Sequence, residues 1–360
     1  MNVPRLLHLV APFVFCAALS AQIDPRTALL ERGAWTALNA GQAHAAAVAF
    51  REALKADPKN ARLHLGAGIA ASLERRDTDA RDEFESALAL DPKLAEARAM
   101  LGQIQYRMGD PSTAIRIYET LLAMTPDDKD ARATLERWQR EAELHDRMQQ
   151  AIGSHFTVSF EGPAEAELAA AALAVLDRAY WRICQLFGAF PLEPINVVLY
   201  TGEQFRDITR APSWAAGAYD GTIRVPMRGA LDKPEELDRV LSHEFAHALI
   251  RTVAAHGVPA WLNEGLATAL EAPDLGWAGT LAAKQPPVPL RALQSGFGRF
   301  TGAQAQLAYA TSALAARRLL DEAGGFAIAN LLRDLGAGAE FDAAFLHRIQ
   351  RPFADFQPQP

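Results

Sequence analysis

The sequence predicts an all-α solenoid of helical repeats followed by a small α+β domain. Two observations carry this prediction. A period of 34 residues runs through the first half of the chain. From about residue 153, stretches with strand character come first and helical stretches follow, which is typical of α+β domains rather than of a wound parallel sheet. At 360 residues the chain has room for two domains.

Composition and charge exclude several classes of protein. Half of the residues are hydrophobic and 22% are charged, with 24 Gly and 21 Pro, which rules out a mostly disordered or collagenous chain. The chain has 36 basic against 43 acidic residues and a net charge of -7. We therefore expect no nucleic-acid partner, because phosphate backbones select basic surfaces.

The first twenty residues have the pattern of a signal peptide. Arg5 supplies the positive start, and residues 6–19 form an uncharged, mostly apolar run that is too short to span a bilayer. Small residues at Ala18 and Ser20 allow cleavage after residue 20. We therefore expect an exported protein, periplasmic or secreted, with no membrane span; the alternative is an uncleaved amphiphilic N-terminus.

The two cysteines favour neither a lipid anchor nor a disulfide. Cys16 follows Phe13, Val14 and Phe15, which do not match the small residues around a lipoprotein acylation site. After cleavage Cys184 would be the one cysteine left, so the exported chain would contain no internal disulfide. The apolar neighbours of Cys184 predict a small core residue rather than a nucleophile.

The 34-residue period separates Pro58, Pro92 and Pro126. Three further positions repeat with the same offset: Phe50, Phe84 and Tyr118; Ala46, Ala80 and Ala114; and Ala53, Ala87 and Leu121. Proline disfavours helix in the residue before it and so predicts turns between repeats, while small Ala residues let paired helices approach around the aromatic ring. This pattern resembles the tetratricopeptide repeat, with three helix-turn-helix units over about residues 27–128.

The resemblance has one departure and leaves the role of the repeats open. Leu30, His64 and Arg98 stand where the family has Trp, so we expect looser helix packing there. Residues 129–152 predict a long charged helix that caps the stack and completes a domain over residues 24–152. The concave face of such a solenoid implies recruitment of a peptide or protein. The alternative is that the repeats only hold the second domain or mediate self-association.

Residues 153–352 predict the α+β domain. Alternating or β-branched stretches predict strands at residues 155–160, 194–200 and 221–227, and helical periodicity predicts helices at residues 164–187, 234–253, 259–271, 304–322, 326–335 and 341–351. We expect residues 217–225 to supply an edge strand beside a cleft, which would bind an extended peptide. Residues 353–360 are expected to form a frayed tail.

The chemistry of this domain is concentrated in the sequence His-Glu-x-x-His at residues 243–247. On a helix, His243 and His247 are four positions apart, so both imidazoles project from one face and can bind one Zn²⁺. Glu244 is rotated by about 100° from His243 and can reach a metal-bound water without ligating the metal. A catalytic zinc site typically has three protein ligands. Glu264, 17 residues after His247, would supply the third from a second helix.

Together with the sequence WLNEG at residues 261–265, this motif resembles the gluzincin metallopeptidases. It is closest to the small peptidase domains related to the thermolysin and M1 aminopeptidase families. The resemblance implies a zinc ion held by His243, His247 and Glu264, with Glu244 as the general base of peptide-bond hydrolysis. The connection to the third ligand is slightly shorter than in the best-known members of the group.

Several neighbouring side chains have two interpretations each. Tyr309 resembles the tyrosine with which related enzymes stabilise the oxyanion; otherwise it is a half-buried helical Tyr whose hydroxyl meets solvent. Glu271 lies two turns beyond the third ligand on the same face, where it would orient a His ligand or be a solvated surface charge. Asn263 and Thr268 are weaker candidates for orienting a ligand. His256, between the two motif helices, is a candidate substrate-side group.

These features predict an exported zinc metallopeptidase whose repeats recruit a protein partner or substrate. The chain lacks the Gly-x-Met-Glu-Asn sequence with which M1 aminopeptidases hold a free N-terminus, so endopeptidase action is favoured over aminopeptidase action. The alternative is a binding or assembly protein in which the repeats carry the function and the peptidase-like domain is structural or silent.

Overall fold

The computed structural model describes residues 25–40, 42–162, 165–201, 218–219, 221–226, 234–271, 274–286, 288–297, 300 and 302–356. These residues divide into two compact units that meet between Glu143 and Leu144, slightly before the predicted boundary at residues 152 and 153. The predicted signal peptide, residues 1–20, lies outside the described residues. Among the helices described, none has both the length and the apolar composition that crossing a membrane requires.

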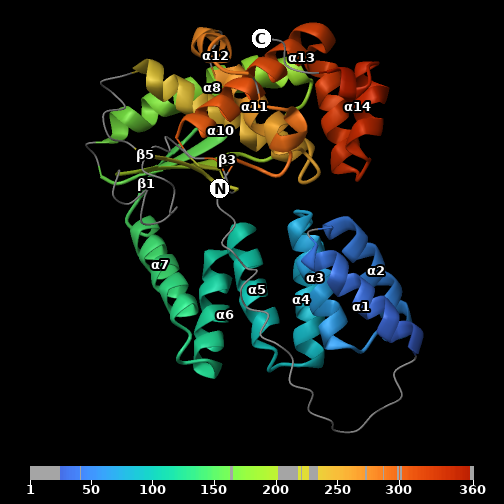
Figure 1. Ribbon diagram of the computed structural model, residues 1–360. Helices are drawn as coiled ribbons and strands as arrows, with labels where there is room; N and C mark the ends of the chain where they lie inside the picture. The colour runs from blue at the N-terminus through green and yellow to red at the C-terminus, as the bar shows by residue number, and fades with distance from the viewer. Residues whose placement is uncertain are drawn as a thin grey trace. The chain divides into compact units, whose positions relative to one another are not determined.

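The first unit consists of paired helices, as the 34-residue period predicts (Figure 1). Its helices are α1 (Pro25–Asn39), α2 (Ala43–Ala56), α3 (Ala61–Leu73), α4 (Asp77–Leu90), α5 (Ala95–Arg107), α6 (Pro111–Met124) and α7 (Lys129–His145). From α1 to α6, each helix packs against the next one along the chain. The all-α repeat architecture predicted for this half is therefore confirmed.

Glycines and aromatic rings at the repeat offset explain how closely the helices approach. A Cβ on Gly68 would lie 2.6 Å from the ring of Phe84, and one on Gly102 would lie 2.5 Å from the ring of Tyr118. Both rings are buried. Each ring occupies the space that a glycine leaves open, so the aromatic position fills the contact between helices as predicted.

A basic side chain holds each inter-repeat turn at the position where the family has Trp. The side chain reaches the carbonyl oxygen of the proline six residues earlier. The distances are 3.1 Å from His64 Nε2 to Pro58, 2.7 Å from Arg98 Nη2 to Pro92 and 2.6 Å from Arg132 Nη2 to Pro126. Arg132 lies on α7, so the repeat pattern continues into the cap helix. A hydrogen bond to the preceding turn thus takes the place of the aromatic packing that the sequence lacks here.

The predicted cap helix at residues 129–152 is too long, and this prediction is wrong at its C-terminal end. α7 ends at His145, and Gln149–Ile152 form strand β1. β1 pairs antiparallel with β2 (Phe156–Phe160), with Gln149 opposite Phe160. Residues 148–152 (MQQAI) carry none of the charge that marks the solvated cap helix, and β1 becomes a strand by pairing with β2.

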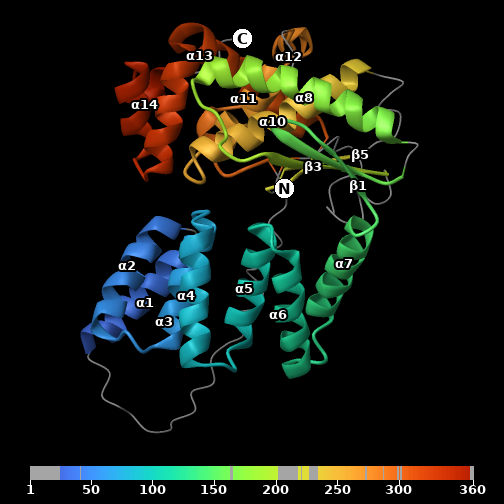
Figure 2. The ribbon, with the colours of Figure 1, turned by 180° about the vertical axis from the view of Figure 1, so that it is seen from behind.

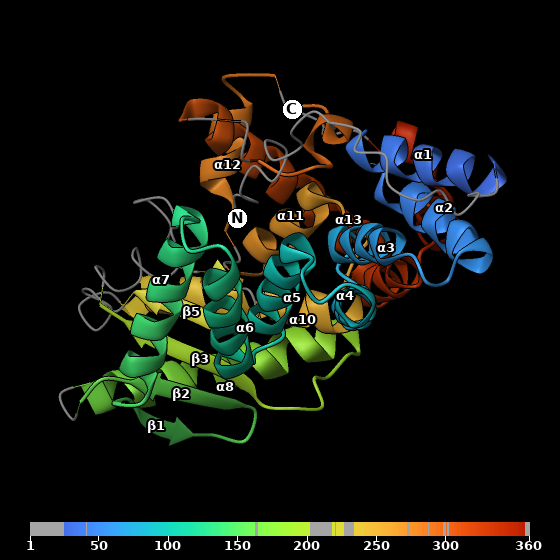
Figure 3. The ribbon, with the colours of Figure 1, turned by 90° about the horizontal axis from the view of Figure 1, so that it is seen from below.

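The second unit is built on one five-stranded sheet, in the order β1-β2-β3-β5-β4. β3 spans Ile195–Tyr200, β4 spans Ala218–Tyr219 and β5 spans Ile223–Pro226. β2, β3 and β5 run parallel, whereas the outer strands β1 and β4 are antiparallel to their neighbours (Figure 3). α8 (Ala166–Phe187) and α10 (Pro234–Val253) pack on the same side of this sheet (Figure 2). The predicted α+β class and the three predicted strands are confirmed.

The remaining helices complete the layer that carries the site. They are α11 (Ala260–Glu271), α12 (Gly276–Ala282), α13 (Ala303–Gly336) and α14 (Phe341–Ile349), with short 3-10 turns at Leu290–Leu293 and Phe353–Asp355. The helices predicted at residues 304–322 and 326–335 are the two halves of α13. They are separated by a kink at Gly324, whose φ of 78° favours glycine. α12 was not predicted.

The predicted frayed tail is wrong for residues 353–356. Phe353 and Phe356 are buried, and the ring of Phe353 stacks on Trp261 with centroids 5.8 Å apart. Two large apolar side chains therefore anchor this end of the chain on α11. Residues 357–360 lie outside the described part of the chain.

Candidate metal centre

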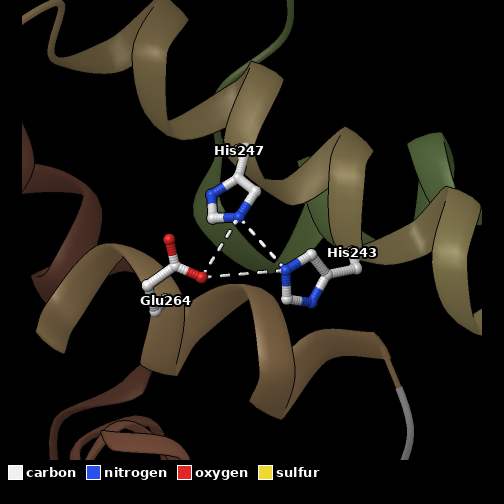
Figure 4. Close-up of side chains that lie close together, drawn as sticks. All are labelled: His243, His247 and Glu264. Carbon is white, nitrogen blue, oxygen red and sulfur yellow. Dashed lines mark hydrogen bonds and ion pairs between the residues drawn. The ribbon is translucent and has the colours of Figure 1, made fainter. Parts of the chain in front are cut away.

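Two neighbouring helices bring the predicted ligands together. α10 begins and ends at the predicted residues, and α11 packs directly against it. The apolar residues of α10, including Leu241 and Phe245, are buried in the core, which leaves His243 and His247 on one face. Glu264 projects from α11 toward both imidazoles (Figure 4).

The three side chains form a compact triangle of ligand atoms. The Nε2 atoms of His243 and His247 are 3.1 Å apart, and Glu264 Oε2 lies 3.9 Å from the first and 3.7 Å from the second. Ligands of a tetrahedral zinc ion, each about 2.0–2.1 Å from the metal, are about 3.3–3.4 Å from one another. The described atoms are within about 0.6 Å of that arrangement. Nitrogen and carboxylate donors are also the ligands that Zn²⁺ takes, so the residues fit this ion.

The outer nitrogens of both imidazoles are held by hydrogen bonds. Glu271 Oε2 accepts from His243 Nδ1 at 2.7 Å, and Asn263 Oδ1 accepts from His247 Nδ1 at 3.2 Å. With the proton on Nδ1, each Nε2 lone pair is directed to the centre of the triangle. The structure thus brings Glu271 and Asn263 to the positions proposed for orienting a ligand. Thr268 is buried in α11, and none of the described contacts joins it to either histidine.

The pKa values of the two histidines are shifted in opposite directions: that of His243 is raised and that of His247 is lowered. Burial alone would lower the pKa of His243, but its hydrogen bond with Glu271 and the charges of nearby carboxylates raise it to about 8. Burial lowers the pKa of His247. The carboxylates therefore favour a positive charge at the centre of the triangle, as a metal site requires.

Glu244 is nearly inaccessible to solvent, at 6% exposure. Burial raises the pKa of its carboxyl to about 7, the positive charge of His243 opposes this rise, and the negative charges of Glu264 and Glu271 add to it. A carboxyl with a pKa near neutrality can both take up and release a proton.

Tyr309, from α13, also reaches the site. Burial and the negative charges of Glu264 and Glu244 raise the pKa of its phenol. The ring packs edge-on against Phe297, with centroids 4.9 Å apart. Of the two interpretations of Tyr309, the structure therefore favours a side chain directed into the site over one whose hydroxyl meets solvent.

Gly265 allows α13 to come close enough to bring Tyr309 to Glu264. A Cβ at Gly265 would lie 2.3 Å from the carbonyl oxygen of Ser312, so the backbones of α11 and α13 are in contact there. Sequence reasoning missed this role. The only signal was a glycine directly after the third predicted ligand.

Three other predictions fall around the site. β4 and β5 lie where the edge strand at residues 217–225 was expected, with β4 at the edge of the sheet; residues 217 and 220 are outside the described part. His256 lies between α10 and α11, and none of the described contacts joins it to the ligand triangle, so its role stays a prediction. Cys184 is fully buried, and burial raises the pKa of its thiol to about 12, which agrees with a core residue.

Family comparisons match both halves of the chain. Residues 175–349 match the Peptidase MA superfamily. Residues 32–95 and 73–138 each match a tetratricopeptide repeat family. A comparison with curated proteins found no match.

Three of the solved structures found by comparison are tetratricopeptide repeat domains. The Sgt2 domain from Aspergillus fumigatus is 22% identical with a TM-score of 0.33, and the alignment covers 36% of this chain and 88% of that one. The Arabidopsis OM64 domain is 18% identical with a TM-score of 0.31, covering 32% and 95%. The first such domain of human RPAP3 is 19% identical with a TM-score of 0.31, covering 32% and 92%. The family matches therefore identify a chain that carries tetratricopeptide repeats followed by a Peptidase MA superfamily domain.

Proposed function

We propose that the protein is a zinc-dependent metallopeptidase that hydrolyses peptide bonds within a chain. The observation that carries the proposal is the convergence of His243, His247 and Glu264 within 3.1–3.9 Å, beside the buried carboxyl of Glu244. Three protein ligands leave one position of a tetrahedral metal open, which distinguishes catalytic from purely structural zinc sites. The superfamily match over residues 175–349 supports the same reaction class.

The bound zinc ion would act as a Lewis acid that polarises the scissile carbonyl and activates water. Glu244 follows His243 directly in α10, so its carboxyl is close to the metal position without being one of the three ligands. In the proposed reaction Glu244 takes the proton of the attacking water and delivers it to the leaving amine. Its low exposure keeps that proton transfer out of bulk water.

Tyr309 would stabilise the negative charge that develops on the carbonyl oxygen. Its phenol lies close enough to Glu264 and Glu244 for their charges to raise its pKa, so the hydroxyl is near the metal position. During the reaction this hydroxyl would donate a hydrogen bond to the developing oxyanion.

We further propose that the substrate is an extended peptide and that the repeats recruit it or a partner protein. β4 ends the sheet, and α10, which carries two of the ligands, packs against β4 and β5. An edge strand binds peptides through main-chain hydrogen bonds and so selects little by sequence. Endopeptidase action is favoured because the sequence lacks the Gly-x-Met-Glu-Asn signature with which M1 aminopeptidases hold a free N-terminus. The signal-like N-terminus supports a periplasmic or secreted location.

The proposed activity is tested with Glu244→Gln and the control Glu235→Gln, which makes the same chemical change at an exposed position of the same helix. An unfolded, fluorescently labelled protein serves as substrate. Glu244→Gln should abolish hydrolysis and still bind zinc, whereas the control should behave like the parent. Hydrolysis retained by Glu244→Gln would refute the base assignment. A parent that holds zinc but cleaves no peptide library, while its isolated repeats capture a partner, would favour the non-catalytic alternative.

A further inference from the structure

We propose that Arg182, on α8, is a positioning residue for the metal centre. This inference rests on the proposed zinc site, because it concerns how two of its side chains are held. Arg182 contacts none of the three ligands. Its guanidinium instead joins α8 to α10 and to α11, the two helices that supply those ligands.

The contacts of Arg182 fall at two particular residues. Its Nη1 donates to the carbonyl oxygen of Leu270 at 2.7 Å, and its Nη2 donates to Ser242 Oγ at 3.1 Å. Ser242 directly precedes His243 on α10, and Leu270 directly precedes Glu271 on α11. One planar guanidinium therefore holds the two residues that come just before the hydrogen-bonded pair His243 and Glu271.

The contacts of the Arg182 guanidinium and the orientation of His243 both depend on how α10 and α11 pack against each other. The Nδ1 atom of His243 and Glu271 Oε2 are 2.7 Å apart across the same helix pair. A slide of α10 past α11 would change this distance and both Arg182 contacts together. Because the guanidinium is rigid and its donors point in fixed directions, it resists such a slide better than a single-point contact does.

The contacts at the C-terminal end of α11 also support a positioning role for Arg182. The last carbonyl groups of a helix lack partners within the helix. Here the Leu270 carbonyl accepts from Arg182, and the neighbouring Ala269 carbonyl accepts from Arg317 of α13. Two cations on different helices thus fix the turn that carries Glu271. Arg239 of α10 adds an ion pair to the same Glu271 at 3.1 Å.

The burial of Ser242 shows that its contact with Arg182 lies in the interior of the protein. Ser242 is fully buried, and its hydroxyl donates to Asp238 Oδ1 at 3.3 Å while it accepts from Arg182. Removing the guanidinium would leave a buried hydroxyl and a helix-end carbonyl without this donor, and the helices would have to shift to satisfy them.

The test compares Arg182→Met and Arg182→Lys with Arg178→Met as matched control. Arg178 lies one turn earlier on α8 and pairs with Asp238 at 3.0 Å across a largely exposed surface. It touches neither Ser242 nor Leu270 among the described contacts. For each protein, three quantities are measured: the zinc dissociation constant by chelator competition, the visible spectrum of the cobalt-substituted protein, and the unfolding temperature of the metal-free protein.

We expect Arg182→Met to weaken zinc binding by up to about 10-fold, the lower end of the range for groups that hydrogen-bond a metal ligand directly. Its cobalt spectrum should also change, because a shift of α10 against α11 would move His243 and Glu271 relative to each other. Arg182→Lys keeps the charge but not the fork, and it should recover part of the affinity. Arg178→Met should match the parent in both readouts. If Arg182→Met does not fold, Arg182→Gln replaces it.

The outcomes separate this inference from the proposed function. A parent with no zinc affinity would overturn both. A parent that binds zinc tightly, with Arg182→Met equal to it in affinity and spectrum, would overturn the positioning role alone. A lowered unfolding temperature with unchanged zinc affinity would likewise show a purely structural role.

Discussion

Replacing Gly265 by Ala tests how closely α11 and α13 must approach for the site to form. The added Cβ would lie 2.3 Å from the Ser312 carbonyl oxygen and 3.1 Å from the Cβ of Ala316. Non-bonded heavy atoms are ordinarily about 3.5–4.0 Å apart, so the helices must separate by about 1 Å. Both obstacles are parts of a helix that cannot rotate out of the way, so the displacement falls on the helix pair as a whole.

The expected cost is that of overpacking a well-filled core, about 1–3 kcal/mol. For a domain of this size, each kcal/mol lowers the unfolding temperature by about 2–4 °C. The same displacement moves Tyr309, which lies one turn before Ser312 on α13, away from Glu264. Gly265→Ala should therefore lower stability and also reduce the rate of peptide hydrolysis.

Gly279→Ala is the matched control, because Gly279 lies in helix α12 and nothing is within 4 Å of the position of its Cβ. Alanine should raise stability there by about 0.5–1 kcal/mol, since it loses less backbone freedom than glycine. The assay is thermal unfolding of the metal-free proteins followed by circular dichroism. A Gly265→Ala variant as stable as Gly279→Ala would refute the close approach of α11 and α13.

Three further substitutions probe separate parts of the second unit. Glu271→Gln should weaken zinc binding about 10- to 100-fold in chelator competition, because the His243 ring loses its charged partner; unchanged affinity would remove Glu271 from the site. Tyr309→Phe should lower kcat about 100- to 1,000-fold with zinc content unchanged, and a parental kcat would rule out the oxyanion role. Phe353→Ala should cost about 3–5 kcal/mol in denaturant unfolding, because the ring is buried on Trp261; a negligible change would mean that this end of the chain does not support the core.

The convergence of His243, His247 and Glu264 could be predicted from the sequence, because the information that brings these three residues together is local. His243 and His247 lie four positions apart on one helix, so helical geometry alone places them together. Glu264 is on the next helix after a short connection, which leaves few ways for the two helices to meet. The apolar periodicity of both helices is long and regular, and their predicted ends agree with the structure to within a residue.

The features that sequence reasoning missed depend on tertiary contacts. β1 is four residues long and alternates little, so it becomes a strand only because β2 pairs with it. Arg182 is far in sequence from both Ser242 and Leu270, and nothing in its own neighbourhood indicates that it joins them. Phe353 belongs to a short terminal segment whose order comes from packing on Trp261 rather than from any helical or strand pattern.

The most direct test is zinc per chain in the purified protein and in Glu264→Ala, with Glu235→Ala as a control at an exposed carboxylate. All three are exposed to zinc, desalted and analysed by mass spectrometry of the metal. About one zinc per chain is expected in the parent and the control, and little in Glu264→Ala, because two imidazoles alone hold the ion weakly. Equal zinc in all three proteins, or none in the parent, would contradict the proposed metal centre.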